Sequence, residues 1–170
     1  MRVAIIDLGS NSIRMNVIDI CDNNAVVLEN IRRIVRLSEG MGEEKLIRQN
    51  AVDRTLAVLK DFKKIIDDMA VDEVRAIATA ALRSAQNPEL FTKPASELGI
   101  DFEIISGERE AYYDYLGVVN TLSVSDCMIV DIGGASTELI YVKDGKNTDT
   151  SARVVRCWVK SRNERNPYLQ

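Results

Sequence analysis

Histidine is absent from all 170 residues of this chain. That absence excludes Ser-His-Asp and Cys-His catalysis, histidine metal sites and histidine general bases within it. Any proton transfer must then fall to carboxylates, Lys, Tyr, Cys or water. The search for a catalytic base therefore begins with the acidic side chains.

Cysteine is scarce, and the three cysteines, Cys21, Cys127 and Cys157, lie far apart without a CxxC pair. This spacing indicates neither a zinc site nor a disulfide framework. It favours a reduced, cytoplasmic setting. The short apolar run that ends at Asp7 is too short for the core of a signal peptide or for a membrane span, so no membrane association is expected.

A basic charge excess is also lacking, because the formal net charge is −4. A general nucleic-acid binder usually carries a basic face, so nucleic acid is not an expected partner. A local basic pocket for a polyanion remains compatible with this balance. Apolar residues make up 46% and charged residues 28% of the chain, which is typical of a globular domain.

Apolar periodicity predicts alternating strands and helices, and therefore an α/β fold. The predicted strands span residues 3–6, 13–20, 25–37, 74–78, 102–105, 128–131 and 137–142. The predicted helices span residues 44–70 and 88–98, with a third from Ser106 to about residue 120. Asp144-Gly145 is a hairpin-turn signal, residues 150–159 could form a further strand, and residues 161–167 resemble a solvated end.

A short segment occurs twice, and the repeat carries more weight than either copy. Residues 5–12 align with residues 129–136, so that Asp7, Gly9 and Ser12 match Asp131, Gly133 and Ser136. In each copy the segment follows an apolar strand and precedes another one.

The residue types in this repeat suit phosphate binding. A small turn with glycine lets backbone N–H groups close around phosphate oxygens, and hydroxyl groups add donors. The Asp at the end of each strand can hold a hydrated divalent cation. One copy alone is more simply interpreted as a tight hairpin, whereas two copies in matched strand context favour phosphate binding.

Four motifs together resemble the exopolyphosphatase/guanosine pentaphosphate phosphatase family of the actin-like ATPase superfamily. They are Asp7-Leu8-Gly9-Ser10-Asn11-Ser12, Ala78-Thr79-Ala80-Ala81-Leu82-Arg83, Ile105-Ser106-Gly107-Glu108-Arg109-Glu110-Ala111 and Asp131-Ile132-Gly133-Gly134-Ala135-Ser136-Thr137-Glu138-Leu139. They occur in the family's order, and the resemblance covers roughly residues 1–146.

The resemblance implies an actin-like (ribonuclease H-like) lobe with a mixed sheet in residues 1–120. The beginning of a second, similar lobe would follow in residues 121–170. This second region would have its phosphate hairpin but no helices to cover its sheet. Since such a sheet face favours a partner, a homodimer is one expectation.

The resemblance also implies hydrolysis of a terminal phosphoanhydride with a divalent cation, usually Mg²⁺. Glu110 matches the glutamate that positions or deprotonates the attacking water. Asp131 and Glu138 match acidic residues around the metal and that water, and Asp7 is expected to help organise the metal. Arg83 matches an arginine that faces the phosphate chain.

The expected phosphate ligands are the residues of the two loops: Gly9, Ser10, Asn11, Ser12, Gly133, Gly134, Ala135 and Ser136. Ala135 departs from the family pattern, which often has a third glycine there. Arg109 is a second departure, because many members have an acidic residue at that position. It could pair with Glu108 or neutralise phosphate.

Several alternatives stay open at this level. Arg83 could be a solvated surface residue, and Glu110 could merely favour the dipole of its helix. Three arginines, Arg32, Arg33 and Arg36, are more simply explained as a charged strand face in water than as a polyanion site. Three tyrosines, Tyr112, Tyr113 and Tyr115, are expected to pack on the interior or rim of the lobe rather than to stack on a guanine.

Three functions are compatible with the sequence. The leading one is Mg²⁺-dependent removal of a terminal phosphate from polyphosphate or from guanosine pentaphosphate, between which the sequence does not discriminate. A second is a module that binds a phosphorylated nucleotide or polyphosphate without turnover. A third is an actin-like kinase or ATPase, which is disfavoured because the second-lobe helices of an adenosine pocket are missing.

Overall fold

The computed structural model describes residues 1–22, 24–123, 125–142 and 154–156, the last of these as backbone. The chain divides into two compact units, Met1–Ser106 and Gly107–Gln170, which are described in turn. No helix among the described residues is long and apolar enough to cross a membrane.

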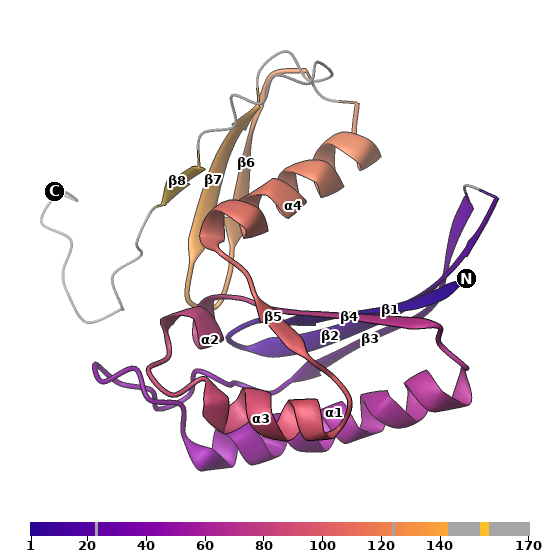
Figure 1. Ribbon diagram of the computed structural model, residues 1–170. Coiled ribbons are helices and arrows are strands. Elements are labelled where there is room, and N and C mark those ends of the chain that lie inside the picture. Colours follow the sequence, from indigo (N-terminus) through magenta and orange to yellow (C-terminus); the bar gives the residue numbers. More distant parts are fainter. Residues whose placement is uncertain (23, 124, 143–153, 157–170) are drawn as a thin grey trace, which may run out of the picture. The chain divides into compact units, whose positions relative to one another are not determined.

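The first unit contains five strands and three helices (Figure 1). In chain order they are β1 (Arg2–Leu8), β2 (Ser12–Cys21), β3 (Asn24–Ile34), α1 (Gln49–Asp68), β4 (Glu73–Ala78), α2 (Ala80–Ser84), α3 (Glu89–Glu97) and β5 (Phe102–Ile104). The strands form one sheet in the order β3-β2-β1-β4-β5. β1 pairs antiparallel with β2 and parallel with β4, which confirms the mixed sheet that the resemblance implies.

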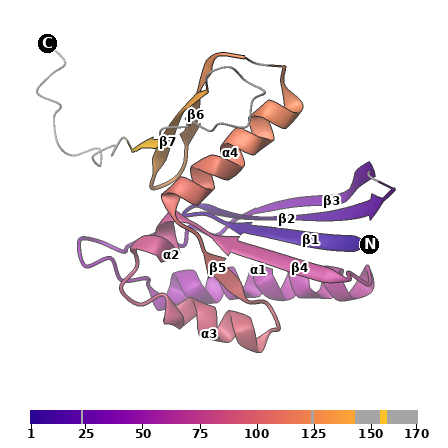
Figure 2. The ribbon, with the colours of Figure 1, turned by 45° about the horizontal axis from the view of Figure 1, so that its top comes forward.

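The core of this unit lies between the sheet and α1. Apolar residues recur along α1 at helical spacing, and Leu59 and Phe62 are 0% and 1% exposed. They pack in one cluster with Ile6 of β1 and Met15 of β2. Figures 1 and 2 show α1 and α3 on the same face of the sheet. Side chains that point to this face are therefore structural, and those on the opposite face are available for other roles.

The second unit contains α4 (Gly107–Thr121), β6 (Cys127–Ile132), β7 (Thr137–Val142) and β8 (Val154–Arg156). Its strands form an antiparallel sheet in the order β6-β7-β8. One face of this sheet packs against α4, where Ala111, Ile140 and Val142 are buried together. The prediction that no helix covers this sheet is wrong for that face, because α4 belongs with β6 and β7 rather than with the first sheet.

The other face of the second sheet is apolar and exposed. Met128, Val130 and Ile132 alternate along β6 and are 64%, 49% and 76% exposed, and Tyr141 of β7 is 48% exposed. Since alternate residues of a strand point to opposite faces, these side chains lie opposite the face that α4 covers.

The predicted elements are close to the observed ones, with three differences. β3 ends at Ile34 rather than at residue 37. α2 was missed, because a five-residue helix is too short to show a helical period. α1 begins at Gln49 rather than at residue 44, since residues 42–45 form turns in which Gly42 and Lys45 have positive φ values of 61° and 52°.

The C-terminal predictions are tested only in part. β8 lies within the strand expected at residues 150–159. The Asp144-Gly145 turn and the solvated end at residues 161–167 lie outside the described residues. The lobe boundary near residue 120 stays a prediction. By its contacts, α4 belongs to the same compact unit as the strands that follow it.

Candidate active site

The first loop of the repeat joins β1 to β2. Asp7 lies near the end of β1, and the backbone N–H of Gly9 donates a hydrogen bond to the carbonyl oxygen of Ser12 at 3.0 Å. Among the described residues, the backbone N–H groups of Ser10 and Asn11 donate to no protein acceptor. A turn with such N–H groups is suited to an anion.

A distant segment holds this loop in place. The carbonyl of Asn11 accepts from the backbone N–H groups of Val35 and Arg36 at 3.0 and 2.9 Å. The carbonyl of Ser10 accepts from the backbone N–H of Ser38 at 3.2 Å and from its Oγ at 3.3 Å. The sequence did not predict a role for Ser38. Ser38 and Ser10 are 28 residues apart in the chain, so no local sequence pattern indicates their contact.

The hydroxyl of Ser10 is unusual. The residue is 4% exposed, and its Oγ has no hydrogen-bond partner among the described residues. A buried hydroxyl without a partner costs free energy, and such groups are rare in folded proteins. Its place in the loop fits a donor that a bound anion would satisfy.

The second loop, between β6 and β7, repeats the first in its hydrogen bonding. The backbone N–H of Gly133 donates to the carbonyl of Ser136 at 2.9 Å, as Gly9 does to Ser12. Space is tight at this glycine, since a Cβ on Gly133 would lie 3.2 Å from the Ser136 carbonyl oxygen. Ala135 is not among the residues with positive φ, so the turn does not require a glycine at that position.

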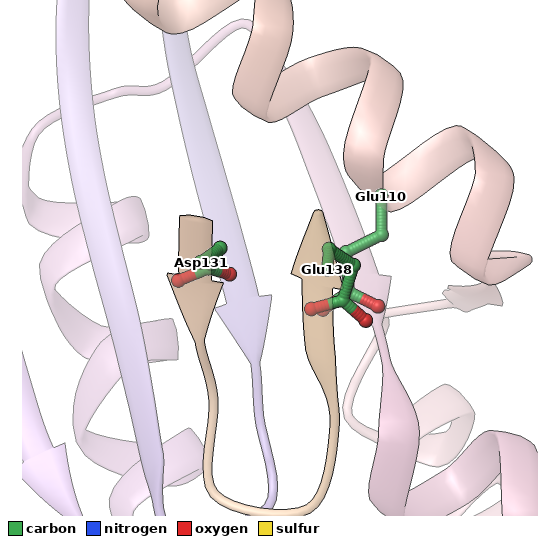
Figure 3. A group of neighbouring side chains, drawn as sticks. All are labelled: Glu110, Asp131 and Glu138. Carbon is green, nitrogen blue, oxygen red and sulfur yellow. The ribbon is translucent and has the colours of Figure 1, made fainter. Parts of the chain in front are cut away.

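Three carboxylates meet beside the second loop (Figure 3). Asp131 near the end of β6 is the cross-strand partner of Glu138 on β7. Glu110 reaches them from the first turn of α4, which packs against β7. One carboxylate oxygen of each residue lies within 4.8 Å of those of the other two.

This cluster has the character of a cation site. Glu138 is only 2% exposed, while Glu110 and Asp131 are partly buried. Negative charges held this close repel one another, and the repulsion grows as water is excluded. Oxygen ligands of this kind suit hard divalent cations. Three of the four residues that the resemblance assigned to metal and water, Glu110, Asp131 and Glu138, therefore lie close together, whereas Asp7 is not part of this cluster.

Arg83 and Asp7 lie in the first unit. Arg83 is in α2, and its Nη1 donates to the carbonyl oxygen of Ile105 at 3.1 Å. The residue is partly buried, and its role toward the phosphate chain stays a prediction. This hydrogen bond holds α2 against the end of β5.

The first turns of α4 also carry an arginine–tyrosine pair. Nε of Arg109 donates to the Tyr113 hydroxyl at 2.8 Å, and its guanidinium lies 5.5 Å from the ring centroid. Tyr112 and Tyr113 are 46% and 38% exposed, so neither packs in the interior. Tyr115, by contrast, packs against the small core under α4.

Sequence comparison finds relatives over most of this chain. Residues 17–157 match the Ppx/GppA phosphatase family. A guanosine-5'-triphosphate,3'-diphosphate pyrophosphatase of Vibrio vulnificus is 42% identical over 139 residues, which are 81% of this chain and 28% of that protein.

Solved structures of Ppx/GppA proteins and exopolyphosphatases have folds similar to that of this chain. The Aquifex aeolicus Ppx/GppA family member matches with a TM-score of 0.77 at 35% identity, over 94% of this chain and 51% of that one. An exopolyphosphatase from Cytophaga hutchinsonii matches with a TM-score of 0.84 at 30% identity, again over 94% and 51%. The chain thus spans about half the length of these solved relatives.

Proposed function

Because the chain belongs to the Ppx/GppA phosphatase family, we propose that it removes the terminal phosphate from inorganic polyphosphate or guanosine pentaphosphate. The observation that carries this proposal is the convergence of Glu110, Asp131 and Glu138 beside a phosphate-type loop. The Vibrio relative is named a pyrophosphatase and the Cytophaga relative an exopolyphosphatase, and both names describe cleavage of phosphoanhydrides.

Glu110 is the proposed base. The chain contains no histidine, and a carboxylate is one of the side chains that can orient an attacking water and accept its proton. Glu110 projects from a helix toward two further carboxylates, so a water molecule held among them would be both oriented and polarised. Phosphoryl transfer depends mainly on such positioning and on charge neutralisation.

Asp131 and Glu138 would hold the cation, which we propose is Mg²⁺. Their carboxylate oxygens and that of Glu110 lie within 4.8 Å of one another, and hard oxygen ligands of this kind suit such an ion. When bound, such a cation would neutralise charge on the phosphate oxygens. Asp7 as a further ligand stays a prediction.

The two loops are the proposed phosphate ligands. Each presents backbone N–H groups and hydroxyls around a turn that is closed by the same Gly-to-Ser hydrogen bond. Arg83 is proposed to face the phosphate chain while it holds the end of β5. A cytoplasmic setting and a homodimer stay predictions from the sequence.

The test is the release of inorganic phosphate from long-chain polyphosphate, guanosine pentaphosphate and ATP, each with Mg²⁺ and with a chelator. We expect Mg²⁺-dependent release from at least one of the first two that exceeds release from ATP. Faster release from ATP would favour an actin-like ATPase. Saturable binding of polyphosphate without release of phosphate would favour the alternative function, a module that binds polyphosphate without turnover.

A further inference from the structure

Two arginines face each other across β2 and β3 on the face of the first sheet that points away from α1. Arg14 of β2 is the register partner of Arg32 of β3. Both are exposed, whereas Ile13 and Met15 on either side of Arg14 are buried in the core beneath α1. Since neighbouring residues of a strand point to opposite faces, Arg14 and Arg32 lie on the face away from α1.

This placement conflicts with an ordinary rule of sheet stability. Like charges directly opposite one another destabilise a strand pair. The chain has a net charge of −4, yet among the described residues neither arginine forms an ion pair. Local conflicts of this kind are expected where a site serves function rather than stability.

The pair is continuous with the first phosphate loop. Ser12, the last residue of that loop, lies two residues before Arg14 on β2 and therefore shares its face. Asp7 is the register partner of Arg14 on the other side, so a row runs from Asp7 through Arg14 to Arg32. Two strand spacings make this row about 10 Å long.

Amides extend the same polar surface. Asn16 and Asn30 are register partners one step further along the strands, on the face of Arg14 and Arg32. The surface thus offers two guanidinium groups and two amides, which can all donate hydrogen bonds to phosphate oxygens.

We propose that Arg14 and Arg32 form a second anion subsite, which binds internal phosphate groups of a polyphosphate chain whose end lies in the Gly9–Ser12 loop. This inference rests on the proposed function and names long-chain polyphosphate as its substrate class. A linear polyanion that leaves the loop along this face meets Arg14 first and Arg32 next. A ligand with only a few linked phosphates ends before it gains the Arg32 contact.

Arg33 supplies a matched control. It is the next residue of the same strand, it is also exposed, and it has the same charge. Its register partner is Ile13, so it lies on the opposite face, and its Nη1 donates to the backbone carbonyl of Arg32 at 3.1 Å. Replacing Arg32 or Arg33 by Gln changes the net charge equally but only the first change touches the proposed subsite.

The experiment measures binding of long-chain polyphosphate and of tripolyphosphate to the full chain, to Arg32→Gln and to Arg33→Gln by calorimetry at several salt concentrations. Arg32→Gln should weaken long-chain binding about threefold, the size expected for one exposed ion pair. It should also reduce the logarithmic salt slope by about 0.7, as for one charge on a single-stranded polyanion. Tripolyphosphate binding should not change, and Arg33→Gln should behave like the unaltered chain.

Thermal unfolding of the variants tests whether a loss of binding arises from a loss of folded protein. Because Arg32→Gln removes one of two facing like charges, its thermal unfolding temperature should equal or exceed that of the unaltered chain. A weaker long-chain affinity in a variant that is at least as stable assigns the loss to the subsite.

Two outcomes would overturn the subsite alone: equal losses in both variants, or equal losses for long and short ligands. Tighter binding of a single-stranded oligonucleotide than of polyphosphate, lost in Arg32→Gln, would overturn it in favour of nucleic acid. If the unaltered chain bound neither phosphate ligand, the subsite and the proposed function would fail together.

Discussion

At the scale of single residues, Ser10 links the fold to the proposed chemistry. Its backbone carbonyl is held by Ser38, while its buried hydroxyl has no partner among the described residues. The backbone of the loop is therefore fixed by the protein, and the side chain is left for a ligand. This division of roles is the one expected of a preorganised anion site.

The substitution Ser10→Ala removes the hydroxyl but keeps the backbone carbonyl that Ser38 contacts, so it tests the role of the hydroxyl alone. Removing an unsatisfied buried hydroxyl should leave the thermal unfolding temperature unchanged or slightly higher. Binding of tripolyphosphate should weaken by about tenfold, because a hydrogen bond to a charged oxygen is lost. Calorimetry and thermal unfolding of the same preparation check both. A large drop in unfolding temperature with unchanged binding would make the hydroxyl structural instead.

The glycines that open the two loops differ in a way the sequence could not reveal. A Cβ on Gly9 would make an ordinary contact, 3.5 Å from the Ser12 carbonyl oxygen, whereas on Gly133 it would lie 3.2 Å from that of Ser136. Neither glycine is among those with positive φ, so the contrast is one of space alone.

Gly133→Ala should therefore destabilise its hairpin by about 1 kcal/mol or more, as overpacking does. Gly9→Ala should be nearly neutral, because alanine also restricts the unfolded chain. Hydrogen exchange of β6–β7 and of β1–β2 reports each hairpin separately. Equal losses of protection in the two variants would show that the contact at Gly133 relaxes without cost.

At the scale of elements, the carboxylate cluster depends on α4 as much as on the hairpin. Asp131 and Glu138 are brought together by the register of β6 and β7, and the repeat in the sequence predicts the hairpin that these strands form. Glu110 joins them only because α4 packs on that sheet. The residue types and the hairpin could be predicted from the sequence. The packing could not, since it depends on contacts between segments far apart in the chain.

Mg²⁺ should stabilise this cluster by relieving its charge repulsion. At one hundred times the dissociation constant the gain is about 2.7 kcal/mol, seen as a rise in unfolding temperature. Glu110→Gln should reduce the rise, whereas Glu97→Gln, an exposed change on α3, should keep it. An identical rise in all three proteins would place the cation elsewhere.

At the scale of the whole molecule, apolar periods in the sequence predicted the α/β class and the strands of the first unit, while the mixed sheet was implied by the family resemblance. Those predictions succeeded because buried strands and the amphipathic α1 have clear periods. The grouping of α4 with the second sheet was missed, since a helix that follows β5 in the chain gives no local sign of which sheet it covers. The Arg14–Arg32 pair was missed for a similar reason, because strand register sets it.

The two units also differ in how much core they bury. Among the described residues, the cluster beneath the first sheet is extensive, whereas the one beneath α4 centres on Ala111, Ile140 and Val142. Apolar burial is the main stabilising contribution to folding, so the described part of the second unit gains less from it than the first unit does. The exposed apolar face of β6 is consistent with this difference.

The most direct test of the account is phosphate release from long-chain polyphosphate with Mg²⁺ by the chain, by Glu110→Gln and by Glu108→Gln. Glu108 lies in the same first turn of α4 but outside the carboxylate cluster, so it is the matched control. We predict that Glu110→Gln lowers the rate by about 10² to 10⁴, as expected for loss of a general base, and that Glu108→Gln keeps it. Release from Glu110→Gln at the unaltered rate, or none from the unaltered chain, would contradict the account.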